Sequence, residues 1–108
     1  MPILGPDPTL SDLQKYVAEL EQERGFANQD VIQKCLMLGE EVGELFKAIR
    51  KQENMSIDNK SQNFIVQEEM ADILIILCTI ANRCDVDLEK AFRDKEKINK
   101  TRAWEQPK

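Results

Sequence analysis

The sequence contains no histidine, and this absence excludes several kinds of site at once. A zinc centre with imidazole ligands, a histidine general base and the Glu-x-x-His iron motif of ferritin-like bundles all need that side chain. Any general base must therefore be a carboxylate, with lysine and cysteine as poor substitutes. Metal ligands, if the chain has any, must be mainly oxygen atoms.

Cysteines are few, namely Cys35, Cys78 and Cys84, and no Cys-x-x-Cys pair occurs. Because Cys35 and Cys78 stand in apolar helical runs, we expect both to be buried, reduced thiols. The first residues lack the basic and apolar regions of a signal peptide, and the longest apolar stretch, residues 73–81, is too short to span a membrane. These features predict a cytoplasmic protein with no membrane partner.

Proline and glycine are scarce between the two ends of the chain. The prolines occupy positions 2, 6, 8 and 107, so roughly a hundred residues are free to form helices. A formal net charge of -5 disfavours binding to nucleic acid, whose phosphates would be repelled. With 108 residues the chain can form one domain, and so small a domain must find any further burial in a partner chain.

Hydrophobic periodicity predicts an all-α protein built as a helical bundle of four helices joined by short loops. The helices are expected at residues 11–24, 31–51, 64–83 and from 88 onward, with N-caps at Ser11, Asp30 and Asp87 and a break at Gly25. The apolar stripe of the second helix is Val31, Cys35, Leu38, Val42, Leu45 and Ile49. Residues 73–81 are apolar nearly all round, which is typical of a helix buried in a bundle or at a subunit interface.

Four acidic side chains form the candidate site: Glu41 and Glu44 on the second helix, Glu69 and Asp72 on the third. Each pair is one turn apart and lies on one helix face. On a helical wheel this face points toward the core side, where burying an unpaired carboxylate costs free energy. A bound cation would offset this cost, and oxygen ligands suit Mg²⁺, with Mn²⁺ as a possible substitute. A solvated acidic face remains an equally good reading of the spacing alone.

Lys95, Asn99 and Arg102 follow at helical spacing on the fourth helix and would share one face. Two cations and an amide could grip a triphosphate. The alternative is a basic helix end that complements the helix dipole.

Taken in order, these motifs resemble a known family. Residues 38–45 and 68–74 resemble the MazG-like all-α nucleoside triphosphate pyrophosphohydrolases, whose signature is Glu-x-x-Glu followed by Glu-x-x-Asp. The pattern Lys95-x-x-x-Asn99-x-x-Arg102 is similar to the family's C-terminal motif, and residues 82–88 are similar to the single-domain dCTP pyrophosphatase subgroup. The resemblance implies a MazG-like domain over residues 11–104, an N-terminal extension at 1–10 and a tail at 105–108.

The resemblance also implies an activity, the cleavage of the bond between the α- and β-phosphates of a nucleoside triphosphate. Mg²⁺ would sit on the four carboxylates, Glu41 or Glu44 would activate water, and Lys95, Asn99 and Arg102 would bind the substrate. A homodimer or homotetramer would complete the bundle. The expected role is the removal of unwanted nucleotides from the cellular pool.

One departure from the family concerns the base. The dCTP subgroup carries tryptophans near the ends of its first two helices, whereas here the corresponding positions offer Gly25-Phe26 and Arg50-Lys51. Phe26 could stack on the base, or it could be an ordinary core residue. Two other functions remain as alternatives, a catalytically silent regulatory module and a phosphohydrolase of the all-α dUTPase type.

Overall fold

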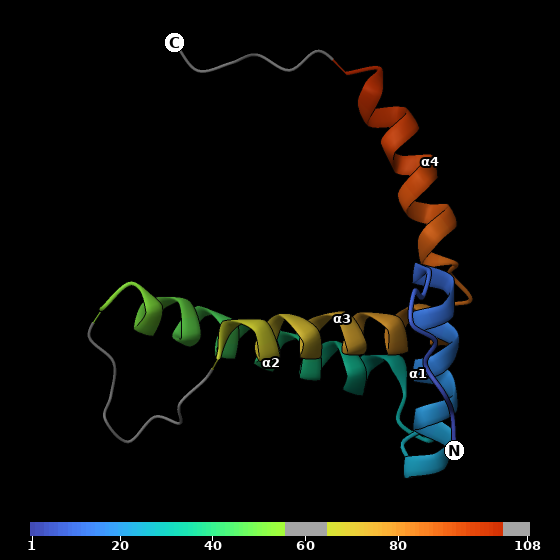
Figure 1. Ribbon diagram of the computed structural model, residues 1–108, viewed down its shortest axis with the longest axis horizontal. Helices are drawn as coiled ribbons and strands as arrows, with labels where there is room; N and C mark the ends of the chain where they lie inside the picture. The colour runs from blue at the N-terminus through green and yellow to red at the C-terminus, as the bar shows by residue number, and fades with distance from the viewer. Residues whose placement is uncertain (56–64, 103–108) are drawn as a thin grey trace.

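The computed structural model describes residues 1–55 and 65–102 and is shown as a ribbon in Figure 1. The described residues form four α-helices and no strand: α1 Leu10–Arg24, α2 Val31–Gln52, α3 Val66–Arg83 and α4 Leu88–Lys100. The all-α, four-helix prediction is confirmed. None of the described helices is both long enough and apolar enough to cross a membrane.

Three of the helices form the body of the molecule. α2 and α3 run side by side in opposite directions, and α1 crosses one end of this pair and packs on α3. α4 begins beside α1 and extends away from the pair, so most of its contacts with other helices are with α1 (Figure 1). Among the described helices, α2 and α3 share the most extensive interface, which we call the α2–α3 groove.

The helix ends follow local capping chemistry. Thr9 caps α1 in a reciprocal pair of hydrogen bonds with Asp12, so the prediction of Ser11 as N-cap is wrong by two residues. Asp30 caps α2 and Asp87 caps α4, as predicted. Gly25 ends α1 with φ of 77°, a conformation that glycine adopts without steric strain.

Two sequence boundaries cannot be compared with the structure. The expected start of the third helix at Phe64 lies outside the described residues. Within the described residues, α3 begins at Val66. The expected domain end at 104 and the tail 105–108 also lie outside the described residues. Beyond the end of α4, Arg102 is no longer helical, so the helical-face argument holds for Lys95 and Asn99 but not for Arg102.

The apolar core of the body is small. Its buried hydrophobic residues are Val17, Ala48, Ile76, Cys78 and Ala81. The prediction for Cys78 is confirmed, but Cys35 is exposed because α2 turns Lys34 rather than Cys35 toward α1 and α3. All three cysteines are free thiols.

Large apolar side chains remain exposed on several helices. On α3 they include Leu74, Ile75 and Leu77, within the stretch 73–81 that the sequence predicts to be buried in a bundle or at a subunit interface. On α4, Phe92 is 69% exposed. This much uncovered apolar surface on a small monomer is typical of a protein that associates with another chain.

Gln14 fixes the point where α4 leaves the body. Its side-chain amide donates to the carbonyl of Val86 at 2.6 Å and accepts from the backbone N–H of Leu88 at 3.1 Å. Asn82 of α3 donates to the backbone carbonyl of Gln14 at 3.1 Å. One residue of α1 thus holds both the end of α3 and the start of α4.

Candidate metal centre

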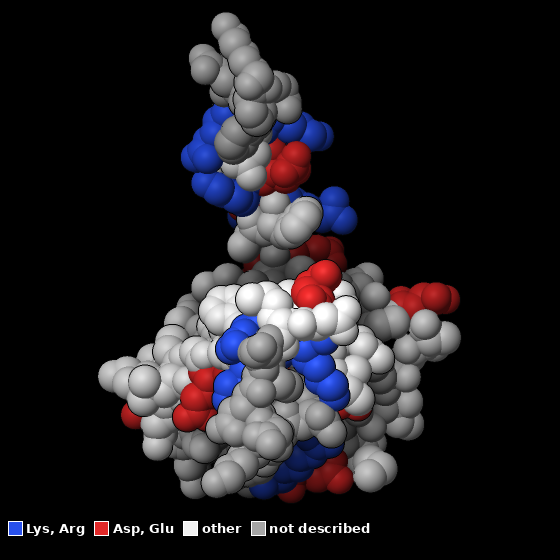
Figure 2. Space-filling model, turned by 90° about the vertical axis from the view of Figure 1, so that its left-hand side faces the viewer, with Lys and Arg blue, Asp and Glu red and all other residues white. Residues whose placement is uncertain are grey.

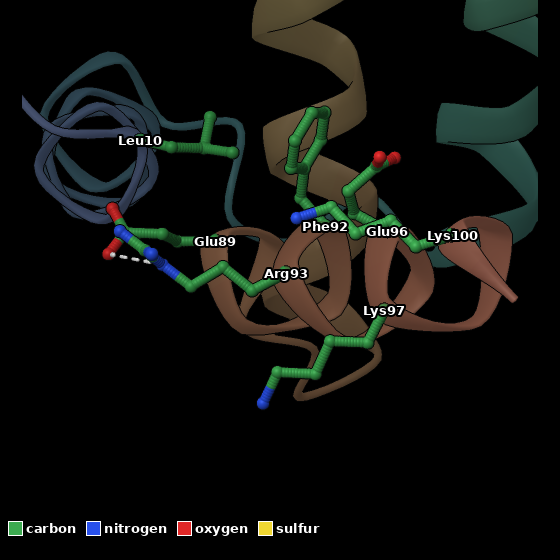
Figure 3. Close-up of a pocket in the computed structure, with 7 residues that line it drawn as sticks. All are labelled: Leu10, Glu89, Phe92, Arg93, Glu96, Lys97 and Lys100. Atoms are coloured by element: carbon green, nitrogen blue, oxygen red, sulfur yellow. Dashed lines mark ion pairs between the residues drawn. The ribbon is translucent and has the colours of Figure 1, made fainter.

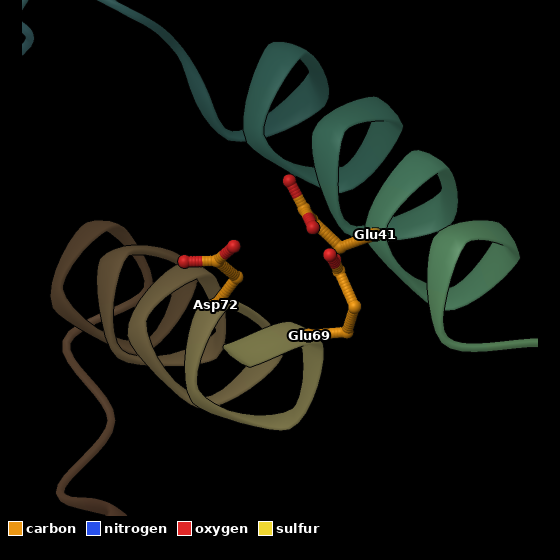
Figure 4. A group of neighbouring side chains, drawn as sticks. All are labelled: Glu41, Glu69 and Asp72. Atoms are coloured by element: carbon orange, nitrogen blue, oxygen red, sulfur yellow. The ribbon is translucent and has the colours of Figure 1, made fainter. Parts of the chain in front are cut away.

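Three acidic side chains meet across the α2–α3 groove. Glu41 comes from α2, and Glu69 and Asp72 come from α3. Each offers a carboxylate oxygen, and these oxygens lie within 4.8 Å of one another. Figure 4 shows the side chains of Glu41 and Glu69 extending toward each other between the two helices, with Asp72 beside them.

Helix geometry explains why these residues meet. Glu69 and Asp72 are three positions apart, so they project from the same side of α3. The α2–α3 packing brings Glu41 onto that side. Glu69 is only 6% exposed and Glu41 is half-buried, whereas Asp72 is exposed at the rim of the groove, contrary to its expected orientation toward the core.

Burial and mutual repulsion make the first two carboxyls weak acids. Burial, followed by hydrogen bonding and charge from neighbouring carboxyls, raises the pKa of Glu41 to about 8. The pKa of Glu69 is also raised, first by burial and then by Glu44 and Asp72, against an opposing hydrogen bond from Glu41. In the absence of a cation, Glu41 therefore holds a proton near neutral pH.

Two buried oxygens of the cluster have no hydrogen-bond partner among the described residues: Oε2 of Glu41 and Oε2 of Glu69. Buried acceptors normally find a donor or a cation. A set of carboxylate oxygens with unpartnered members fits a hard divalent cation. A solvated acidic face does not account for Glu69, which is buried.

Glu44 lies at the edge of this group. Its oxygens are not among those that converge within 4.8 Å. It is nevertheless near enough to raise the pKa values of both Glu41 and Glu69 by hydrogen bonding and by its charge. The structure thus brings three of the four predicted carboxylates into one cluster and leaves Glu44 beside it.

Residues 29–103 match the family described as the MazG nucleotide pyrophosphohydrolase domain, and this stretch includes every residue of the acidic cluster. The chain belongs to the MazG family. The family prediction made from the motifs is confirmed.

Curated relatives and a solved structure agree with this assignment. The chain is 32% identical over 102 residues to dCTP pyrophosphatase 1 of Rattus norvegicus and 33% identical over 102 residues to dCTP pyrophosphatase 1 of Homo sapiens. These alignments cover 90% of this chain but 60% of each relative, so the chain spans about three-fifths of their length. The crystal structure of iMazG from Vibrio DAT 722 matches with a TM-score of 0.65 and 30% identity, over 91% of this chain and 100% of that one.

The basic motif of this MazG chain stands apart from its acidic cluster. Lys95 and Asn99 line a cavity of about 530 Å³ that α4 shares with Leu74 and Leu77 of α3. Leu74 is two positions after Asp72, which places it on roughly the opposite side of the helix. In Figure 1, α4 leads away from the α2–α3 groove, and in Figure 2 the part that projects from the body carries many basic side chains. One chain therefore does not bring the two motifs together.

A second cavity, of about 540 Å³, lies between α4 and Leu10 of α1 and is lined by no residue of the acidic cluster. Figure 3 shows Phe92 and Leu10 at its apolar centre, with charged side chains of α4 around them. Among those, Arg93 pairs with Glu89 at 3.8 Å. The apolar centre and charged rim of this cavity suit contact with a protein surface better than catalysis.

Phe26 stands half-exposed at a small cavity of about 150 Å³ between α1, α2 and α3. The same cavity is lined by Glu21 and Lys34, which sequence reasoning did not single out. Neither residue belongs to a motif, and a charged residue within a helix is ordinarily solvated. Only the tertiary packing shows that both are buried.

Proposed function

We propose that this chain is a Mg²⁺-dependent nucleoside triphosphate pyrophosphohydrolase that converts (d)NTPs to (d)NMPs and pyrophosphate in the cytoplasm. The observation that carries the proposal is the cluster of Glu41, Glu69 and Asp72, in which two buried oxygens have no partner. Membership of the MazG family and the likeness to two dCTP pyrophosphatases support the same reaction class.

The proposed roles follow from position. Glu41, Glu69 and Asp72 would hold the cation, with Glu44 at the edge of the site. When bound, Mg²⁺ would neutralise phosphate charge and polarise the phosphorus–oxygen bonds. Glu41 or Glu44 would accept the proton of the attacking water, because no histidine is present to serve as the base.

The substrate-binding residues would come from a second copy of the chain. Lys95 and Asn99 are remote from the carboxylates within one chain, and Arg102 follows them beyond α4. A homodimer, or a tetramer of two dimers, would place the α4 segment of one chain over the acidic groove of another. The exposed apolar residues of α3 and α4 support such an assembly.

The reaction is tested with a panel of normal and modified dNTPs, incubated with Mg²⁺, with Mn²⁺ and with a chelator. We expect pyrophosphate as the direct product and no turnover in the chelator. A protein that turns over no nucleotide would be the silent module considered above. Orthophosphate as the first product would exclude cleavage between the α- and β-phosphates.

The metal site is tested with Glu69→Gln, which removes a buried ligand but keeps the side-chain shape. We expect the rate to fall at least about 100-fold, because losing a ligand should cost no less than the losses known for its supporting contacts. Glu68→Gln is the matched control, since Glu68 is the exposed neighbour and should keep full activity. Far-UV circular dichroism checks that both variants fold, and wild-type turnover by Glu69→Gln would remove Glu69 from the site.

A further inference from the structure

α4 is held to the rest of the chain almost entirely at its first turn. None of its residues is buried, although Phe92 carries a large apolar side chain. Beside Phe92 and Leu10 of α1 lie the two cavities of about 530 and 540 Å³ described above, so the side chains there are not closely packed. Apolar contacts between α4 and the body therefore do not fix the direction of the helix.

The connection between α3 and α4, residues 84–87, is short and hydrogen-bonded to the helices on either side. The backbone N–H of Val86 donates to the carbonyl of Ala81 at 2.9 Å, and Asp85 has a φ of 53°, as in the Schellman motif that ends many helices. The side chain of Asp87 then caps the first turn of α4. These bonds order each end of the connection locally, but they do not relate α4 to α1.

One side chain of α1, that of Gln14, relates α4 to the body. Its Nε2 donates to the carbonyl of Val86 at 2.6 Å, and its Oε1 accepts from the backbone N–H of Leu88 at 3.1 Å. We call these two bonds the Gln14 clamp. The first N–H groups of a helix have no partner within the helix, so the clamp supplies an acceptor that α4 lacks. Because both bonds come from one planar amide, they fix the start of α4 in angle as well as in distance.

The proposed phosphate-binding residues lie far along α4 from the Gln14 clamp. Lys95 is seven residues after Leu88, and Asn99 is eleven residues after it. At about 1.5 Å per residue, these positions lie roughly 10 and 16 Å from the clamp. A change of about 20° in the direction of α4 would move Asn99 by roughly 6 Å, far more than the few tenths of an ångström that a hydrogen bond tolerates. The direction set by Gln14 therefore decides where both side chains stand.

We propose that Gln14 is a positioning residue for the nucleotide: it fixes the direction of α4 and thereby brings Lys95 and Asn99 to the phosphates. The proposal rests on the proposed function, from which it takes the role of these two side chains. Gln14 is not part of the acidic cluster, so its replacement should weaken nucleotide binding while the cation still binds. This difference distinguishes positioning from a general loss of structure.

The first measurement is the direction of α4, which requires no nucleotide. Spin labels are attached to Glu19→Cys on α1 and Lys97→Cys on α4, after the exposed thiols are removed by Cys35→Ser and Cys84→Ser. Pulsed electron paramagnetic resonance, on labelled chains diluted in unlabelled ones, gives the distance between the two labels of one chain. Gln14→Met should make the distance distribution at least about twice as broad, because methionine has a similar length but makes neither bond. An unchanged distribution would overturn the proposal, since other contacts would then hold α4.

The second measurement is the affinity for nucleotide. The non-hydrolysable α,β-imido analogues of dCTP and dTTP are titrated into the full chain with Mg²⁺ in a calorimeter. Gln14→Met should bind them at least about 10-fold more weakly than the wild type, because a misplacement of about 1 Å can already cost about 100-fold in rate. Equal affinity in the two proteins, or no binding of either analogue to the wild type, would overturn the proposal.

Cation binding is measured separately, by titrating Mn²⁺ without nucleotide. The affinity of Gln14→Met should stay within about 2-fold of the wild type, since Asn82, which donates to the carbonyl of Gln14, lies ten residues or roughly 15 Å along α3 from Asp72. A parallel loss of Mn²⁺ and nucleotide affinity would mean that the substitution disturbs the whole body, and the positioning role would be excluded.

Two further variants control for folding. Lys15→Met, on the exposed neighbour in α1, is the matched control and should keep the wild-type distance distribution and affinities. Gln14→Glu keeps the acceptor for Leu88 but cannot donate to Val86 at neutral pH, so it should have an intermediate effect on both measurements. If Gln14→Met does not fold by circular dichroism, Gln14→Glu decides by the same criteria.

Turnover of the natural dNTPs, measured in parallel, separates this proposal from the proposed function. Positioning predicts a rise in KM with little change in kcat, whereas a loss of folded protein would lower kcat alone. Pyrophosphate release with the same KM in the wild type and Gln14→Met would leave the pyrophosphohydrolase in place and remove the role of Gln14. Nucleotide binding that depends on Gln14 without pyrophosphate release would keep the positioning role and remove the proposed reaction.

Discussion

At the scale of single residues, Glu41 shows most clearly how burial in the acidic cluster changes the protonation of a carboxyl. Its carboxyl is half-buried, its Oε2 has no partner among the described residues, and its pKa is raised to about 8. In the unfolded chain the same carboxyl would titrate near 4.5. Between pH 4.5 and about pH 8, Glu41 binds a proton in the folded protein but not in the unfolded chain. Its contribution to stability is therefore greatest at the acidic end of this range and declines as pH rises.

This difference predicts how Glu41→Gln behaves without metal. In a chelating buffer the wild-type free energy of unfolding should fall from pH 5 to pH 8, by no more than about 1.4 kcal/mol per pH unit for one group. Glutamine cannot ionise, so the variant should lose much of this slope and be the more stable protein at pH 8. Urea unfolding at both pH values measures the effect. Glu40→Gln, on the exposed neighbour, should keep the wild-type slope.

Mg²⁺ should reverse the order at pH 8. Added metal should raise the stability of the wild type, because under the proposal it binds the folded cluster and not the unfolded chain. Glu41→Gln should gain much less from the same concentration. Equal gains in the two proteins would mean that the cation binds elsewhere.

At the scale of secondary-structure elements, Arg83 connects the end of α3 to both sides of the α1–α2 connection. It donates to the carbonyls of Phe26 and Gln29 in that connection and to the carboxylate of Glu21 in α1. Its side chain is 15% exposed and that of Glu21 is 9% exposed. Removing one partner of such a pair leaves a buried charge and several unpaired carbonyls.

Arg83→Met should therefore destabilise the protein by about 3 kcal/mol. The measurement is chemical unfolding followed by circular dichroism. Arg93→Met provides the comparison, because Arg93 forms an exposed ion pair with Glu89 at 3.8 Å and such pairs contribute little. If the two variants were equally stable, the Arg83 network would not hold the α1–α2 connection in place.

At the scale of the whole molecule, the separation of α4 from the acidic groove predicts sites shared between chains. Glu69→Gln would lack a proposed metal ligand and Lys95→Met a proposed phosphate-binding cation, so each alone should be nearly inactive. In a mixed dimer one of the two sites contains neither substitution. Co-refolding equal amounts should recover about a quarter of the wild-type activity, because half of the dimers are mixed and each has one intact site.

The apolar surface of α4 provides the control for this mixing experiment. Phe92→Glu, placed in both variants, should prevent association and abolish the recovery, since Phe92 is 69% exposed in the single chain. Light scattering coupled to size-exclusion chromatography reports the oligomeric state. No recovery in a mixture that remains dimeric would show that one chain supplies the whole site.

The sequence by itself determined the features that depend on local chemistry. The scarcity of proline and glycine, with the caps Asp30 and Asp87 and the break at Gly25, predicted the helices and most of their described ends. The spacing of Glu69 and Asp72 placed them on one side of α3, because a helical repeat needs no tertiary information. The absence of histidine excluded imidazole ligands before any fold was known.

Only the tertiary structure decided which helix face is buried and which residues meet. The exact rotation of α2 buries Lys34 and exposes Cys35, although the apolar stripe had indicated the reverse. The side chains of two adjacent helical residues point about 100° apart, so a modest rotation of the helix decides which of them is buried. The charges of Glu21 and Lys34 compensate each other only when α1 and α2 are packed together. Likewise, the direction in which α4 leaves the body depends on the long-range hydrogen bonds of Gln14, which local sequence cannot encode.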